Sequence, residues 1–326
     1  MENPIDDLTF IQQIAPCKYG NVYLTSKQGS SIQYCTKIID RNVIDKNKSE
    51  KKFLEKEISI LKDLNHPDII KLIETKETED KYYIVTEYYN GGNLEQYVNV
   101  YKHLYHRNLP EKIVQYIMRQ IIEAFKYIHN KNILHRKISL QNIMINYHDE
   151  KDKQNADILK AQIKICNFNY ATYVSKGNKE RKHIGIPLYM DPISLIHPDD
   201  YEYNHKYDIW SLGIVCYKLL TGESPFCSNN QFQELLDRVH IGTYNVPKIW
   251  SKELVSFLNC MLQYEPDKRL GIEHLYNHEF LRKNTNEFNK INLDNLKDIE
   301  ISDSNIVMKI KNNEQQMAYF GNGIEN

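Results

Sequence analysis

The stretch that decides the fold is LHRKISLQNIMI, residues 134–145. Polar side chains stand at short intervals within this apolar run, and they are His135, Arg136, Lys137, Ser139, Gln141 and Asn142. The stretch contains no carboxylate, although it holds two cations side by side. The rest of the sequence must show whether these groups belong to an active catalytic site or to a site that has lost its catalytic activity.

The composition is that of a soluble globular protein. The chain has 326 residues, 41% hydrophobic and 26% charged, enough for one large domain or two modest ones. A formal net charge of −1 provides no electrostatic footprint for nucleic acid or an anionic membrane. No apolar run reaches the ~20 residues that span a bilayer, and the N-terminal MENPIDDLTF lacks the features of a signal peptide. We expect a cytoplasmic protein, with the nucleus as the alternative, that binds neither nucleic acid nor membranes.

The first 90 residues are dominated by short segments with strand patterns. These segments are DLTFIQQI, NVYLTS, IQYCTKII, IIKLIET and KYYIVTEY. One helix interrupts them, because apolar residues recur at helical spacing in SEKKFLEKEISILKDL. YYNGG, residues 88–92, predicts a turn and a hinge.

Beyond this turn the pattern is helical. The segments LPEKIVQYIMRQIIEAFKYIHN and SKELVSFLNCMLQYEPDKRL predict amphipathic helices, and DIWSLGIVCYKLL predicts a buried central helix. Residues 147–161 interrupt two short strands and predict a solvated hairpin insertion. Residues 284–326 are polar and Asn-rich, which predicts a disordered or loosely docked tail. A small β-rich lobe, a hinge and a larger helical lobe together indicate a two-lobed cleft protein.

Eight motifs, in order and at suitable spacing, resemble those of a eukaryotic protein kinase of the serine/threonine type. They read YCTKII, EISILKDLNHPDII, YIVTEYYNGGNL, HRKISLQN, NFN, GIPLYMDPI, DIWSLG and PDKRL. The resemblance implies an α+β, bilobal protein-kinase-like fold over residues 1–283. Its β-rich N-lobe with one main helix would cover residues 8–88, its hinge residues 87–92, and its larger, mainly helical C-lobe residues 93–283.

The resemblance also implies a nucleotide cleft. Lys37 would meet the α- and β-phosphates of ATP, and Glu57 would hold that lysine. The gatekeeper and the hinge residues that face adenine would be Thr86, Glu87, Tyr88 and Tyr89. The other cleft positions would be Gly20, Val22, Cys35 and Met144. Residues of the family's internal packing spine are retained as well, namely Leu61, Leu72, His135, Phe168 and Asp208.

The departures from the family begin at the phosphate and metal positions. The family's G-x-G-x-x-G loop reads APCKYG, so Ala15 and Cys17 replace glycines whose missing Cβ atoms let backbone amides approach phosphate. Asn142, a metal ligand of the family, is retained, whereas Asn167 and Asn169 replace the aspartate and the glycine of D-F-G. An amide oxygen can ligate Mg²⁺ but brings no negative charge. We therefore expect weak ATP binding, and a weak Mg²⁺ site at Asn142 and Asn167 or none.

The acceptor side of the site departs further, and no catalytic set is intact. Lys137 replaces the general base, Ser139 the phosphate-contacting lysine, Leu140 a proline, and Ile186 the threonine that links the first two positions. A positioned general base contributes typically ~10²–10⁴-fold to a rate. A cation there would repel a metal ion but attract a phosphate, so Lys137 would be able to replace the positive charge lost at Ser139.

The activation segment also carries substitutions. Lys182 occupies the usual phosphothreonine position, whereas Arg136, the family's partner of that phosphate, is retained, and Thr172 and Ser175 remain candidate phosphosites.

At the end of the segment Ile193 replaces the glutamate of A-P-E. Its usual partner, Arg269, must find another acceptor or reach solvent, because a buried unpaired charge is costly.

These substitutions predict a pseudokinase-like scaffold or allosteric partner, with a protein partner, an active kinase being one candidate, and little or no phosphotransfer. The alternative is an ATP-dependent serine/threonine protein kinase with an atypical catalytic loop that uses Lys37, Lys137 and Asn142. A third interpretation places the function in the tail or in the insertion at 147–161, with an empty cleft.

Overall fold

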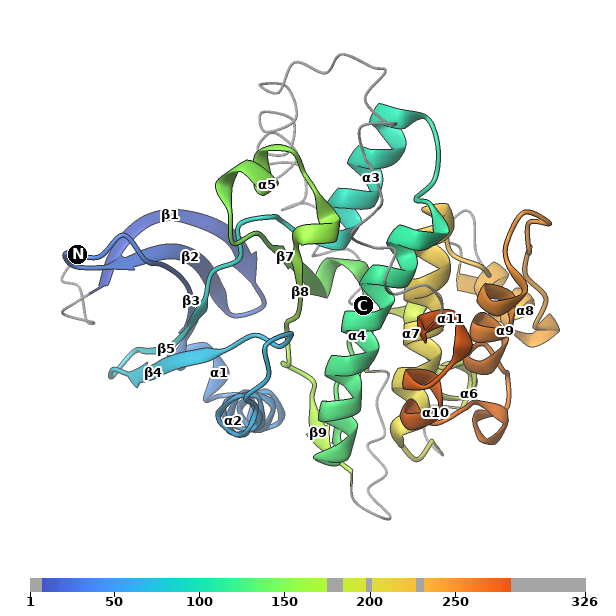
Figure 1. Ribbon diagram of the computed structural model, residues 1–326. Helices are drawn as coiled ribbons and strands as arrows, with labels where there is room; N and C mark the ends of the chain where they lie inside the picture. The colour runs from blue at the N-terminus through green and yellow to red at the C-terminus, as the bar shows by residue number, and fades with distance from the viewer. Residues whose placement is uncertain (1–7, 175–183, 198–200, 227–231, 283–326) are drawn as a thin grey trace.

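The structure, a computed structural model, describes residues 8–174, 184–197, 201–226 and 232–282. Figure 1 shows two lobes, a smaller one built on a β-sheet and a larger one built on helices. The predicted α+β bilobal fold is therefore confirmed. Ser175, Lys182 and the tail at 284–326 lie outside the described residues.

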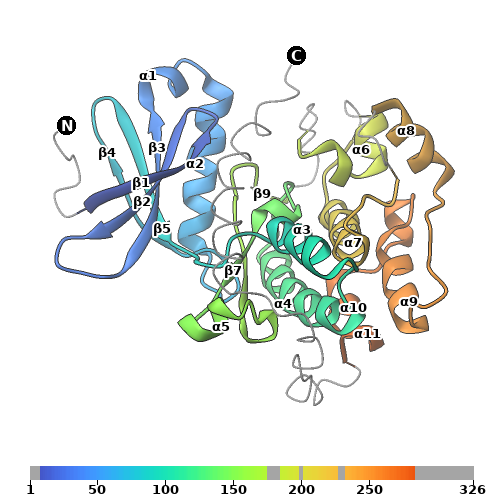
Figure 2. The same ribbon diagram turned by 90° about the horizontal axis from the view of Figure 1, so that it is seen from above.

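The N-lobe is a five-stranded antiparallel sheet with α2 against one face, as Figure 2 shows from above. In spatial order its strands are β1 (Leu8–Cys17), β2 (Gly20–Lys27), β3 (Gln33–Asp40), β5 (Lys81–Glu87) and β4 (Leu72–Glu77). The short helix α1 (Arg41–Ile44) and the main helix α2 (Lys48–Asp63) follow β3. The side chain of Asn47 accepts the first free N–H groups of α2, which fixes where the helix begins. The five predicted strands and the predicted helix are all present.

A second small sheet joins the two lobes. Strands β7 (Ile143–Asn146) and β8 (Gln162–Ile165) form an antiparallel pair, and Ile165 forms a parallel bridge to Ile69 just before β4. The hinge is held to β7, because the Asn90 amide exchanges hydrogen bonds of 2.9 and 3.0 Å with the backbone of Tyr147. The turn predicted from YYNGG is thus tied to the C-lobe.

The C-lobe is packed around α7 (His205–Thr221), whose residues are buried on nearly every side. The other helices are α3 (Leu94–Tyr105), α4 (Glu111–Asn130), α6 (Pro192–Ile196), α8 (Phe232–Ile241), α9 (Lys252–Met261), α10 (Ile272–Tyr276) and α11 (Glu279–Arg282). Short strands β6 (Ile133–Leu134) and β9 (Thr172–Tyr173) and the 3₁₀ turns η1 (Leu140–Asn142), η3 (Pro187–Tyr189) and η4 (Pro266–Lys268) complete it. The predicted central helix and both predicted amphipathic helices are confirmed.

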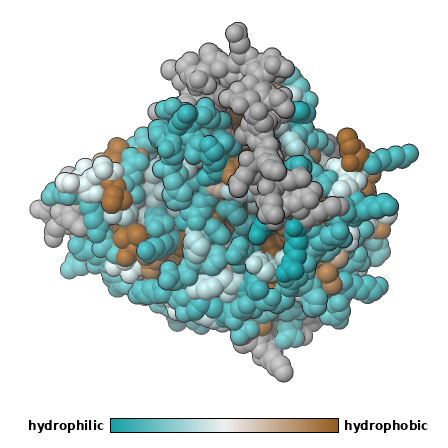
Figure 3. Space-filling view, in the orientation of Figure 1, coloured by the Kyte–Doolittle hydropathy of each residue, from teal (hydrophilic) through white to brown (hydrophobic). Residues whose placement is uncertain are grey.

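The face of the molecule drawn in Figure 3 is mostly hydrophilic in its described residues. Exposed hydrophobic residues form small separate spots on this face. Within the described ranges, no helix combines the length and the apolar character that crossing a membrane requires.

The insertion between β7 and β8 differs from its prediction. Residues 147–161 form α5 (Glu150–Gln154) and the 3₁₀ turn η2 (Ile158–Lys160) instead of a solvated hairpin. The middle is exposed, but Tyr147, Ile158 and Ala161 belong to the main hydrophobic core. Tyr116 of α4 also donates a hydrogen bond of 3.1 Å to the Ala161 carbonyl. The solvated interpretation is wrong for the two ends of the insertion, because they cover the flank of α4.

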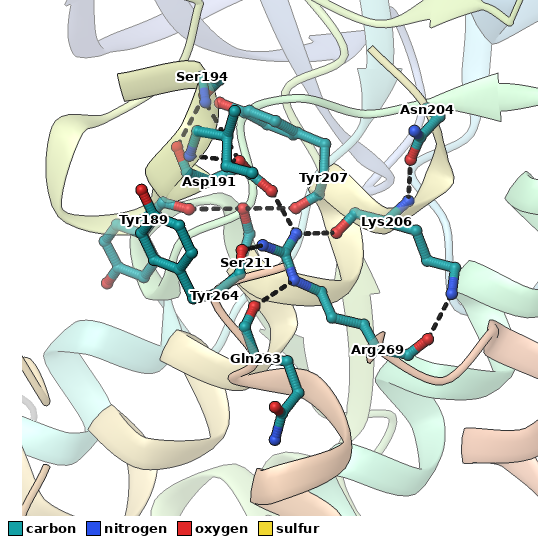
Figure 4. A network of polar contacts seen from close by, with 11 residues as sticks. Tyr189, Asp191, Ser194, Asn204, Lys206, Tyr207, Ser211, Gln263, Tyr264 and Arg269 are labelled. Atoms are coloured by element: carbon teal, nitrogen blue, oxygen red, sulfur yellow. Dashed lines mark hydrogen bonds and ion pairs between the residues drawn. The ribbon is translucent and has the colours of Figure 1, made fainter. Parts of the chain in front are cut away.

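A buried ion pair closes the activation segment onto the C-lobe (Figure 4). The Arg269 guanidinium pairs with the carboxylate of Asp191, and both side chains are fully buried. The arginine also donates hydrogen bonds of 2.8–3.0 Å to the carbonyls of Lys206, Gln263 and Tyr264. The expectation that Arg269 needs a new acceptor is therefore confirmed, and that acceptor stands two residues before Ile193.

Asp191 has a second function at the same place. Its other carboxylate oxygen accepts the backbone N–H groups of Ile193 and Ser194, at 2.8 and 3.2 Å, and thereby caps α6. Ile193 itself packs against the main core. One carboxylate thus neutralises the arginine and begins the helix, which is why the core tolerates Ile193.

Asp191→Asn should keep the α6 cap but remove the charge that balances Arg269. Leaving one partner of a buried pair uncompensated costs about 3–5 kcal/mol, which urea unfolding would measure. Adding Ile193→Glu to this variant should recover part of that loss. A cost below about 1 kcal/mol for Asp191→Asn would show that the arginine is neutralised in another way.

Two histidine rings pack between α4 and α7. The ring of His205 lies 4.6 Å from that of His129, which in turn contacts Asp208 at 3.1 Å. Burial, together with the neighbouring His129, lowers the pKa of His205 to about 4. The folded protein therefore keeps His205 neutral at pH values where an unfolded chain would protonate it.

The stability of the fold should consequently fall as the pH falls from about 7 to about 4. In this window the unfolded chain binds a proton at His205 that the folded chain does not, which costs about 2–3 kcal/mol at pH 4. His205→Gln should flatten the dependence of unfolding free energy on pH, whereas the exposed His148→Gln should leave it unchanged. Equal slopes for wild type and His205→Gln would contradict the assignment.

Candidate functional site

The loop that contains residues 134–142 is anchored by one buried carboxylate, that of Asp208. Asp208 of α7 accepts the backbone N–H groups of His135 and Arg136, at 2.9 and 3.0 Å. Arg136 is held at a φ of 60°, a conformation that costs energy for a residue with a Cβ atom. The backbone bonds to Asp208 stabilise this turn just before position 137.

His135 completes the connection between the loop and the NFN motif. Its Nε2 lies 3.0 Å from the Cys166 carbonyl, its Nδ1 faces the Lys137 N–H at 3.2 Å, and its ring contacts Phe168 edge to face. Burial lowers the pKa of His135, which matches a neutral ring that donates at Nε2 and accepts at Nδ1. The predicted spine residues His135, Phe168 and Asp208 are thus in contact, and Leu61 and Leu72 pack in the same core.

The lysine–glutamate pair predicted from the motifs is formed. The ammonium of Lys37 on β3 lies 2.8 and 3.1 Å from the two carboxylate oxygens of Glu57 on α2. Burial would lower the pKa of Lys37, but the charge and hydrogen bonds of Glu57 raise it on balance. Lys37 therefore remains charged, and Glu57 fixes the direction of its side chain.

Helix α2 is held in this position by the start of the activation segment. The Tyr170 ring meets Phe53 edge to face at 5.4 Å, and Lys56 donates to the Thr172 hydroxyl at 3.0 Å. Thr172 is only 6% exposed. A kinase could not reach its hydroxyl without unfolding this contact, so the folded state contradicts Thr172 as a phosphosite. Arg136 is only 1% exposed and lies against the Tyr203 ring, so it presents no accessible cation to a phosphate.

The side chains of two hinge residues, Glu87 and Tyr89, point toward β8. Tyr89 is buried, with its hydroxyl 3.1 Å from Glu87 and its ring beside the ammonium of Lys164. Glu87 also lies 3.9 Å from Lys164, so both side chains pack toward β8. Any contact of these two residues with a purine base would use their backbone groups.

Most of the other predicted cleft residues lie on strands β2, β3 and β5, next to the hinge. Sheet register places Val22 beside Lys37 and Cys35 beside Thr86, whose hydroxyl donates to the Cys35 carbonyl at 3.3 Å. Two more of these residues, Tyr88 and Met144, are partly exposed, and Met144 pairs with Asn93. The structure therefore brings the predicted nucleotide-binding set into one region.

The predicted phosphate loop is a tight hairpin. Cys17 pairs directly with Gly20, so only Lys18 and Tyr19 form the turn. A Cβ atom at Gly20 would lie 1.9 Å from the Ile38 carbonyl oxygen, so packing against β3 by itself demands the glycine. Pro16, whose significance the sequence reasoning missed, adds a further loss because proline has no N–H to offer a phosphate.

The two candidate metal ligands contact each other. The Asn167 amide donates to the Asn142 side-chain oxygen at 2.9 Å, and the Asn142 amide donates to the Lys137 carbonyl at 2.8 Å. Asn167 lies at a φ of 66°, which asparagine tolerates better than most residues. A metal ion would have to compete with the Asn167 amide for the oxygen of Asn142, without the negative charge that an aspartate would supply.

The acceptor side carries a cation, a buried hydroxyl and an isoleucine at the three positions that hydrogen-bond one another in the family. The Lys137 ammonium lies 4.9 Å from the centre of the Tyr170 ring, a cation–π contact. The Ser139 hydroxyl is buried and makes no hydrogen bond within the described part of the chain, and Ile186 packs against the main core. The polar link between these three positions, which the sequence predicts to be missing, is absent among the described residues.

Comparison with known proteins agrees with this geometry. A family model described as "Protein kinase domain" matches residues 8–281. One curated relative is the serine/threonine-protein kinase ATG1a of Arabidopsis thaliana, 29% identical over 283 residues. The match covers 86% of this chain and 42% of that relative, so the chain spans less than half of the relative's length. Because the family model covers most of the chain, and the lobes, hinge and lysine–glutamate pair are in place, the chain belongs to the protein kinase domain family.

Proposed function

We propose that this chain is a pseudokinase that acts by binding a protein partner and performs little or no phosphotransfer. The observation that carries the proposal is the hydrogen bond between Asn167 and Asn142. It joins the only two side chains that the family would use for Mg²⁺ here, and neither bears a charge. In phosphoryl transfer the metal ions neutralise the developing charge on the phosphates, so this loss affects the chemical step directly.

The acceptor side supports the same proposal. A lysine replaces the base, and its ammonium is engaged by the Tyr170 ring. An ammonium cannot accept a proton from a hydroxyl, so the ~10²–10⁴-fold contribution of a general base is lost. Proton removal and metal binding fail at two neighbouring positions, Lys137 and Asn167.

The cleft nevertheless keeps features that favour nucleotide binding. Lys37 is charged and oriented by Glu57, and a charged lysine attracts the phosphates of ATP without a metal. We propose weak, metal-independent ATP binding that involves these residues and the hinge backbone. The bound nucleotide would stabilise the closed arrangement of the lobes that a partner recognises.

A slow serine/threonine kinase is the second candidate. The formed Lys37–Glu57 pair favours it, because active members of the family require this pair. The serine/threonine kinase relative supports a kinase ancestry, but its printed name describes that longer protein and not this chain.

ATP should raise the melting temperature of the purified chain by about 2–4 °C at concentrations well above its Kd. The shift should be nearly the same with and without Mg²⁺ and should disappear in Lys37→Ala. Lys52→Ala, an exposed lysine of α2, is the matched control. A shift that requires Mg²⁺ would favour the slow kinase, and no shift at all would favour an empty cleft.

Transfer of labelled phosphate from ATP to protein substrates should not exceed background in wild type. Asn167→Asp should make nucleotide binding depend on Mg²⁺, since it restores a carboxylate and removes the amide that donates to Asn142. Activity should remain absent, because Lys137, Ser139 and Ile186 are unchanged. Robust transfer by wild type that vanishes in Lys37→Ala would overturn the proposed function.

A further inference from the structure

A groove lies on the C-lobe surface, away from the cleft between the lobes. It has a volume of about 630 Å³ and lies between the loop before α9, one side of α9 itself and the segment after η4. Its apolar lining comes from the side chains of Val246, Pro247, Trp250, Val255 and Leu270. Ile249, in the same loop, is 89% exposed. This isoleucine extends the apolar lining of the groove to the surface. A contiguous exposed apolar surface of this kind indicates a site that another segment covers.

The rim of this groove is basic. Lys248, Lys252 and Lys268 all line it and all are exposed. Lys268 pairs with Glu265 at 2.9 Å, whereas Lys248 and Lys252 form no ion pair within the described ranges. Lys252 is also the first residue of α9, where the helix dipole disfavours a cation. An acidic ligand placed here would offset both the charge of the rim and this unfavourable position.

The described chain ends beside the groove. Ser256 lines the groove and lies 3.2 Å from the Nε2 atom of His278. His278 directly precedes α11, which packs against α9 and ends at Arg282. Figures 1 and 2 both show α9, α10 and α11 close together in the C-lobe. The 44 residues 283–326 thus follow directly in the chain from a helix that packs against α9, one wall of the groove.

One stretch of the chain after Arg282 has the complementary chemistry. Residues 293–303, LDNLKDIEISD, carry four acidic side chains against one lysine, and they alternate with leucine and isoleucine. The sequence on either side is basic, with Lys283 and Lys290 before it and Lys309 and Lys311 after it. The acidic character is thus concentrated in these residues, whereas apolar side chains also follow them at Ile306, Val307, Met308 and Ile310.

We propose that residues 293–303 bind in the groove of their own chain, with their isoleucine and leucine side chains on the apolar lining and their carboxylates at Lys248 and Lys252. Ten residues, and therefore eleven Cα–Cα steps, separate Arg282 from Leu293. A linker of this length reaches up to ~36 Å when extended and spans on average ~17–20 Å when flexible. Its effective concentration is in the millimolar range, so contacts that would be weak between separate molecules suffice within one chain.

Hydrogen–deuterium exchange on the full chain tests this proposal. The amides of residues 293–303 should exchange more slowly in wild type than in Lys248→Glu/Lys252→Glu, by roughly 3- to 30-fold for two rim charge pairs. The tail variant Asp298→Lys/Glu300→Lys should lose protection to the same extent, and combining both pairs of reversals should restore it. Lys46→Glu/Lys52→Glu, two exposed lysines of the N-lobe, is the matched control and should change nothing.

Each other result identifies a different occupant and overturns the proposal. Protection of the tail that survives the groove reversals would place the tail elsewhere. Protection of the groove that depends on protein concentration would indicate a second copy of the chain. An unprotected groove and tail in wild type would leave the surface for a separate partner. If Lys248→Glu/Lys252→Glu does not fold, the tail variant Asp298→Lys/Glu300→Lys still tests the proposal, because it changes no residue of the described lobes.

Discussion

The buried carboxylate of Asp208 is the constraint on which the catalytic loop depends. It accepts two backbone N–H groups of the loop and contacts His129 of α4, so α4, α7 and the loop are fixed to one another. Burial would raise the pKa of Asp208, but its hydrogen bonds and the nearby histidines lower it on balance. Hydrogen bonds to a charged group contribute about 1.5–3 kcal/mol each, which is enough to hold Arg136 in a left-handed conformation. The position of residue 137 is therefore set by the backbone, whichever side chain stands there.

The loop backbone is thus held in place independently of the charge of the side chain at position 137. This explains how the fold is kept although the residues at several catalytic positions of the family are replaced. Where a substitution threatened stability, a neighbouring group compensates: Asp191 neutralises Arg269 in place of the residue at 193, and the Asn167 amide satisfies the oxygen of Asn142. At the acceptor side no group restores what was lost, since Lys137 packs on Tyr170 and the Ser139 hydroxyl is buried without a hydrogen bond in the described structure. The compensations preserve packing and charge balance, which agrees with the proposed role that needs little or no phosphotransfer.

The sequence was most informative where local pattern and packing agree. The strands of the N-lobe and helices α2, α4 and α7 follow directly from apolar periodicity and helix caps. Helix α3 was not predicted, although Leu94, Val98 and Tyr101 stand at helical spacing behind a capping box formed by Asn93 and Gln96. The ends of the insertion were misassigned because their charged middle dominates the pattern, while burial of Tyr147 and Ile158 depends on α4, a distant part of the chain.

By itself the sequence determined the family, the two lobes, the lysine–glutamate pair and most of the positions that depart from the family's motifs. These depend on residue types in a fixed order, which a motif records completely. Only the tertiary structure decided where the remaining groups point: Glu87 and Tyr89 toward Lys164, Thr172 into a buried contact with Lys56, and Asp191 toward Arg269. Arg269 lies far along the chain from Asp191, and their pairing requires α6, α7 and η4 to pack together. The partner of a side chain is determined by three-dimensional packing and by the free-energy cost of burying an unpaired charge. Neither can be inferred from the local sequence.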